Sequence, residues 1–186
     1  DGIREGRRIF VNTRTYLYAT IASNFGNMLS VAGAALLLPF IPLLPSQILL
    51  LNIVSDLPML AIGTDRVSNE DVAKPLGWNT RAIAKFMLIF GVISSAADYA
   101  TFGILFLFTH TTPMLFRSGW FFESLLTELV VIFLIRSRHI LTAGWPSRAL
   151  IASSVGALVL GCAFVWTRLG HPFELVALSP PLVLAI

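Results

Sequence analysis

The sequence has little charge and almost no cysteine. Its single cysteine, Cys162 among 186 residues, excludes an internal disulfide framework and a metal box built from cysteine pairs. Charged residues make up 12% of the chain and hydrophobic residues 56%, whereas a soluble domain carries about 25% charge. The sequence also lacks a phosphate-binding glycine-rich loop, a nucleophile elbow and a metalloprotease motif. We therefore expect no site for covalent or hydrolytic chemistry in this chain.

The hydrophobic residues are gathered in blocks, most of them near the ~20 residues that a helix needs to cross the hydrocarbon core of a bilayer. We expect six such segments: Tyr16–Leu38, Leu44–Ile62, Phe86–Phe108, Trp120–Ile135, Ala149–Trp166 and Leu175–Ile186. The last segment is too short to span and is expected to be a truncated helix of a longer protein. The fold class predicted is an all-α membrane protein, a six-helix transmembrane bundle.

The basic residues orient these segments in the membrane. If the N-terminus is cytoplasmic, only Arg117 and Arg168 lie outside, and the other eleven basic residues lie inside. Such an excess of inside lysine and arginine is the usual pattern of membrane proteins. The eleven are Arg4, Arg7, Arg8, Arg14, Arg66, Lys74, Arg81, Lys85, Arg136, Arg138 and Arg148. This asymmetry accounts for the net charge of +3 and makes a nucleic-acid partner unnecessary.

Four carboxylates fall within the predicted spans, namely Asp56, Asp98, Glu123 and Glu128. A charged side chain at mid-membrane costs from ~2.5 kcal/mol upward and usually faces a bundle interior or a cavity. Glu128 is expected to be a cation ligand or gate, with a structural role as the alternative. Asp98 could instead pair with Ser94, Ser95 or a neighbouring helix. Glu123 lies closer to the outer end of its span, where we expect water to reach it.

Neutral polar residues accompany these acids on the first two spans. Asn24 and Asn27 are three residues apart and share a helix face; Asn52 and Asp56 are four apart and share another, with Ser55 beside them. These residues, Glu128 and Asp98 are expected within ~10 Å of one depth, at 1.5 Å of rise per residue. Converging oxygen ligands of this kind suit Mg²⁺ or Ca²⁺.

Pro58 adds to the predicted cation site, and a simpler interpretation of the polar residues stays open. Pro58 lacks an N–H, so a carbonyl one turn earlier loses its helical partner and could become another ligand. The alternative is that the asparagines and the serine only hydrogen-bond neighbouring helices.

The histidines, His110, His139 and His171, fall in loops on both sides of the membrane and are not expected to form a metal site. The tryptophans Trp78, Trp120, Trp145 and Trp166 are expected in the interfacial aromatic belts.

Long stretches of the sequence resemble the P-type cation-transporting ATPases. "EGRRIFVNTRTYLYATIASNFGNMLSV" and "LPSQILLLNIVSDLPMLAIGTD" are similar to the fifth and sixth transmembrane helices of that family. "KPLGWNTRAIAKFMLIFGVISSAADYATFGIL" and "FRSGWFFESLLTELVVIFLIRSR" are similar to its seventh and eighth helices. The Asn-Phe-Gly-Asn stretch and the loop after the sixth helix most resemble the bacterial magnesium-translocating type.

The resemblance implies a set of cation ligands. In the family, the fifth, sixth and eighth helices supply them together with an unwound fourth helix. The matching positions here are Asn24, Asn27, Asn52, Ser55, Asp56 and Glu128. Calcium pumps of the family carry glutamate in place of Asn27, and magnesium-type relatives often carry a neutral amide in place of Glu128. Both departures bear on which cation is transported.

The resemblance also implies which parts of a pump this sequence supplies and which parts lie in other domains. Residues 1–15 correspond to a cytoplasmic stalk and residues 16–186 to the C-terminal transmembrane domain. The family's phosphorylation motif, Asp-Lys-Thr-Gly-Thr, does not occur in the sequence, so ATP is expected to act only on domains outside it. The implied partners are the bilayer, the first four helices, and the phosphorylation, nucleotide-binding and actuator domains.

The leading hypothesis is therefore the membrane part of an ATP-driven cation pump, of the magnesium type, in a bacterial plasma membrane. The alternative is a stand-alone membrane protein, acting as a passive cation pathway or a scaffold without ATPase activity.

Overall fold

A computed structural model describes residues 2–67, 69–73, 77–108, 112–136 and 145–186. Within these ranges the chain is helical and contains no strand. The order is α1 (Gly2–Leu37), α2 (Pro45–Ala61), the 3₁₀ turn η1 (Ile62–Thr64), α3 (Asn69–Ala73), α4 (Thr80–Phe108), α5 (Pro113–Ile135), α6 (Arg148–Trp166), the 3₁₀ turn η2 (Arg168–Phe173) and α7 (Pro180–Ala185). His110 and His139 lie outside the described residues.

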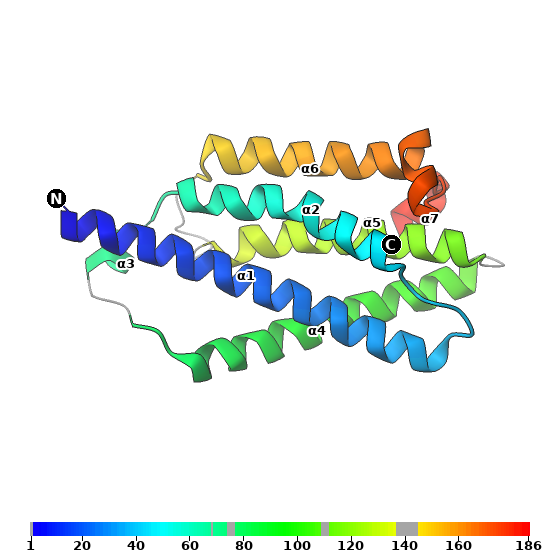
Figure 1. Ribbon diagram of the computed structural model, residues 1–186, viewed down its shortest axis with the longest axis horizontal. Helices are drawn as coiled ribbons and strands as arrows, with labels where there is room; N and C mark the ends of the chain where they lie inside the picture. The colour runs from blue at the N-terminus through cyan, green and yellow to red at the C-terminus, as the bar shows by residue number, and fades with distance from the viewer. Residues whose placement is uncertain (1, 68, 74–76, 109–111, 137–144) are drawn as a thin grey trace.

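Five helices of the described chain are long and apolar enough to cross a membrane, namely α1, α2 with η1, α4 up to Leu107, α5 and α6. Figure 1 shows them running side by side along the length of the molecule. The predicted all-α membrane bundle is thereby confirmed. The sixth predicted segment, Leu175–Ile186, contributes only the six-residue α7, since Pro180 and Pro181 begin a helix after a non-helical stretch.

Two spans begin earlier than their hydrophobicity predicts. The fourth was predicted from Trp120, but α5 begins at Pro113. Proline is well suited to the first turn of a helix, because the N–H that it lacks would have no helical partner there. The Thr112 hydroxyl caps this end by accepting a hydrogen bond from the Leu115 amide at 3.3 Å. In the same way α4 begins at Thr80 rather than at Phe86, because the Asn79 side chain accepts a hydrogen bond from the Ala82 amide at 3.1 Å.

Helix α5 lies at the centre of the bundle and contacts α1, α2, α4 and α6. Its residues from Phe116 to Leu125 are all buried, and Phe116, Trp120 and Phe121 are fully enclosed. Trp120 is therefore a core residue, and its predicted place in an interfacial belt is wrong. An aromatic ring at a helix end is interfacial only if that face meets lipid, and this face of α5 meets α4 instead.

The polar residues of α5 are buried with its aromatic ones. Glu123 has a relative exposure of 5%, so the expectation that water reaches it is wrong. Arg117 was expected in an outer loop but is buried in the second turn of α5. Its guanidinium group donates to the Ile41 carbonyl at 3.0 Å and to Glu174 at 2.6 Å. These bonds join α5 to the two loops beside it.

Candidate functional site: a buried carboxylate between three helices

Glu128 on α5 is the centre of the candidate cation site. Its relative exposure is 5%. Oε1 of the carboxylate accepts hydrogen bonds from the Ser23 hydroxyl at 2.5 Å and the Asn27 amide at 2.8 Å, both on α1. Oε2 is buried and has no hydrogen-bond partner among the described residues. A buried polar atom without a partner is costly, so Oε2 is a position where a ligand would be stabilised.

Helix α2 closes the third side of this site. The Ser55 side chain, 2% exposed, lies close enough to Glu128 to interact with its carboxyl group. Its hydroxyl is aimed at the Asn52 carbonyl, 3.3 Å away and one turn earlier on α2. Ser55, Asn27 and Glu128 therefore meet from three different helices, as their shared depth predicted.

The other three predicted residues make no described hydrogen bond to Glu128. Asn24 is exposed, and its amide donates to the Thr20 carbonyl of its own helix at 2.9 Å. Asn52 and Asp56 are half-buried on α2. Helix α2 continues through Pro58 to Ala61, so the proline does not break the helix beside Asp56.

A narrow cavity reaches Glu128 from the side of α4. It is lined by Ala22, Ser23, Phe90, Ser94, Thr127, Glu128 and Val131. The space open to the centre of a water molecule is about 10 Å³, near the lower limit for one water. Among the described residues, no three His, Cys, Asp or Glu side chains come together in a metal-binding group. A cation at Glu128 would therefore depend on neutral oxygens as well as on the carboxylate.

A second buried acid lies beside the first. Asp98 on α4, 1% exposed, accepts hydrogen bonds from Ser30 on α1 and from Trp120 and Ser124 on α5. Of the alternatives weighed from the sequence, pairing with a neighbouring helix is the one that the structure shows. Ser95 instead donates to the Gly26 carbonyl at 3.1 Å.

Sequence reasoning missed the serine and tryptophan partners of these acids. Ser23, Asn27 and Ser30 follow the i, i+4, i+7 spacing of one helix face, and Trp120, Ser124 and Glu128 follow the i, i+4, i+8 spacing of another. This spacing is the signal that could have found them.

At the end of the bundle where α1 begins, polar contacts tie α1 to the segment after α2. The Asn12 amide donates to the carbonyls of Gly63 and Asp65 at 3.0 and 3.1 Å. The Arg7 guanidinium donates to the carbonyls of Val72 and Ala73. This segment is therefore held directly by α1, the helix that also carries Ser23 and Asn27.

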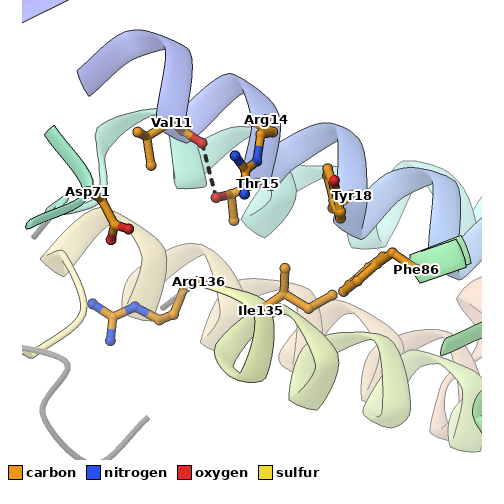
Figure 2. A pocket seen from close by; sticks show the side chains of 8 residues that line it. All are labelled: Val11, Arg14, Thr15, Tyr18, Asp71, Phe86, Ile135 and Arg136. Carbon is orange, nitrogen blue, oxygen red and sulfur yellow. Dashed lines mark hydrogen bonds between the residues drawn. The ribbon is translucent and has the colours of Figure 1, made fainter. Parts of the chain in front are cut away.

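The same end holds a pocket of about 220 Å³. Figure 2 shows Arg14 and Tyr18 on α1 at one side of it, with Ile135 and Arg136 at the end of α5 on the other. Val11, Thr15, Asp71 and Phe86 complete the lining. None of these residues lines the Glu128 cavity, so the two spaces have separate walls.

Comparison with known proteins places this arrangement in a family. The family model described as "Cation transporting ATPase, C-terminus" matches residues 40–186. The chain belongs to this family. It is 37% identical over 96% of its length to the "Magnesium-transporting ATPase, P-type 1" of Escherichia coli (strain K12), of which it covers 20%. The identity and coverage are the same for the protein of that name from Salmonella typhimurium (strain LT2).

A more distant relative is archaeal. The "Putative cation-transporting ATPase MJ1226" of Methanocaldococcus jannaschii is 29% identical over 87% of the chain, which covers 20% of it. The chain thus spans about a fifth of the length of these curated relatives. This member of the cation-transporting ATPase C-terminal family is a multi-pass membrane protein whose sequence matches the C-terminal part of P-type pumps of the magnesium type.

Proposed function

We propose that the chain forms the intramembrane cation-binding part of an ATP-driven P-type pump, and that its cargo is Mg²⁺. The observation that carries this proposal is the buried Glu128 carboxylate, which has one oxygen without a partner among the described residues. It lies where α1, α2 and α5 meet. Magnesium is favoured over other cations by the names of the bacterial relatives.

Each residue of the site has a proposed role. Glu128 is a ligand through Oε2, and Asn27 and Ser55 supply neutral oxygens from the facing helices. Asp56, Asn52 and Asn24 are sequence neighbours of Ser55 and Asn27 on α2 and α1, and we propose that they complete the coordination. Mg²⁺ keeps several of its waters when bound, so few direct ligands are required.

The rest of the pump supplies the energy. ATP would act on phosphorylation, nucleotide-binding and actuator domains. The curated relatives are about five times as long as this chain, which is long enough for such domains. We propose that the end of the bundle where α1 begins is cytoplasmic, as the inside excess of basic residues indicates. In this orientation residues 1–15 form a stalk, and the Arg7 and Asn12 bonds carry its movement to the segment after α2.

The test is Mg²⁺ transport by the full-length pump in lipid vesicles. We expect Asp56→Asn to weaken the Mg²⁺ dependence of transport and of phosphorylation by ~10-fold or more, since even groups that only support a metal ligand contribute 10–100-fold to affinity. Glu5→Gln is the matched control, because Glu5 is an exposed carboxylate near the N-terminal end of α1. Unchanged transport and phosphorylation in Asp56→Asn would contradict the proposed ligand set.

The nucleotide sequence upstream of Asp1 distinguishes the pump from the alternative, a passive cation pathway or scaffold. The coding sequence upstream of Asp1 should contain the Asp-Lys-Thr-Gly-Thr motif in the same reading frame. A start codon directly before Asp1 would instead favour a stand-alone protein. The family membership favours the pump.

A further inference from the structure

Asp98 is surrounded by hydrogen-bond donors. Oδ2 accepts from the Ser30 hydroxyl at 2.5 Å, and Oδ1 accepts from the Trp120 indole at 2.9 Å and the Ser124 hydroxyl at 3.3 Å. The indole N–H can only donate. Several donors aimed at one carboxyl group stabilise its ionised form. Asp98 is therefore the hydrogen-bond acceptor at the centre of this cluster.

Glu123 lies beside Asp98 and has an oxygen without a hydrogen-bond donor. Its Oε1 accepts from the Thr127 hydroxyl at 2.6 Å, and its carboxyl group lies close enough to Asp98 for the two groups to interact. Oε2 is buried and has no partner among the described residues. Two ionised carboxylates are both acceptors and cannot hydrogen-bond each other. A proton on Glu123 turns this contact into an O–H···O⁻ bond.

Among the described residues, no ion pair neutralises either acid. The described ion pairs join Arg8 to Glu5, Arg117 to Glu174 and Arg136 to Asp65, so none of them includes Asp98 or Glu123. Helix α1 faces the pair with Ser30, and α5 adds Thr127 and the carboxyl group of Glu128, which acts on Glu123 as a further like charge. Two adjacent ionised carboxylates in a membrane interior repel each other strongly and both lose hydration.

We propose that Asp98 and Glu123 form a binding site for one proton, distinct from the proposed Mg²⁺ ligands. Glu123 holds the proton on Oε2 and donates it to Asp98, so the pair carries one negative charge in place of two. A metal cation fits this position less well, because hydrogen-bond donors already point at both oxygens of Asp98. The site does not depend on the proposed Mg²⁺ ligands.

The test is infrared difference spectroscopy of the full-length protein in lipid vesicles at neutral pH with saturating Mg²⁺. A protonated carboxyl group gives a C=O stretching band that an ionised one lacks, and this band shifts in D₂O. We expect wild type minus Glu123→Gln to show one such band. Glu5→Gln, which removes an exposed carboxylate on α1, is the control and should show none.

The conservative variants keep the test independent of misfolding. In Glu123→Gln the amide N–H can donate to Asp98 in place of the proton, so the protein should stay folded and lose only the band. In Asp98→Asn the new amide can donate to Glu123, which then ionises, and the same band should disappear. A folded Glu123→Gln protein that retains the wild-type band overturns the proposal, as does wild-type protein whose band appears only when Mg²⁺ is removed.

Discussion

The buried ion pair between Asp65 and Arg136 offers a quantitative test of how the bundle is held together. Arg136 Nε donates to Asp65 Oδ2 at 2.7 Å, and the Ser147 amide donates to Oδ1 at 2.8 Å. The two side chains are 8% and 3% exposed. The pair therefore joins the ends of α2, α5 and α6 in an environment that solvent barely screens.

Arg136→Met leaves the buried Asp65 carboxylate without its counter-charge. Removing one partner of a buried pair costs about 3–5 kcal/mol, which is ~10²-fold or more in the ratio of folded to unfolded protein, at 1.4 kcal/mol per factor of ten. Asp65→Asn made in the Arg136→Met background removes the stranded charge while keeping an acceptor for the Ser147 amide. The double variant should therefore recover part of the loss.

The assay is equilibrium unfolding in mixed detergent micelles, followed by circular dichroism, for both single variants and the double variant. We expect a coupling energy of about 2 kcal/mol or more, given by the failure of the single effects to add. Any contact of Arg136 other than that with Asp65 is lost in both Arg136 variants, so it cancels from this difference. Effects that add to within ~0.5 kcal/mol would refute the reasoning.

Two further predictions concern packing and orientation. Gly170→Ala should destabilise the protein by about 1–3 kcal/mol, because its new Cβ would come 1.9 Å from the rigid backbone oxygen of Phe164. Gly156→Ala is the control, since a Cβ at Gly156 meets no atom within 4 Å. Equal thermal stability of the two variants would contradict the packing around Gly170. In a protein with Cys162 replaced by alanine, Leu169→Cys should react with a membrane-impermeant maleimide from outside intact cells and Gly77→Cys only after permeabilisation; the reverse pattern would invert the proposed orientation.

The sequence predicted the helical spans well because hydrophobic length is a strong signal, and it predicted their starts poorly. Thr112 and Pro113 set the start of α5 through a cap and a first-turn proline, which act locally and leave no trace in hydrophobicity. Trp120 shows the related limit for side chains. Whether an aromatic residue near a helix end meets lipid or another helix depends on the packing of α4, which lies outside the local sequence.

The candidate site was predictable to the extent that it depends on depth. Asn27, Ser55 and Glu128 were expected in one layer, and the structure brings them together. Rotation about each helix axis was less predictable, since Asn24 shares a broad face with Asn27 yet is exposed. The partners of Asp98 could not be ranked before the register of α1 and α5 against α4 was known, because several serines lie at a suitable depth.

The most direct test of the central claim is Mg²⁺ binding measured by calorimetry on the purified full-length protein and its Glu128→Gln variant. Glutamine keeps the shape of the side chain and removes the charge at Oε2. We predict that the variant loses ~10-fold or more in Mg²⁺ affinity while remaining folded. Wild-type affinity in a folded Glu128→Gln protein would contradict the claim that this buried carboxylate binds the transported cation.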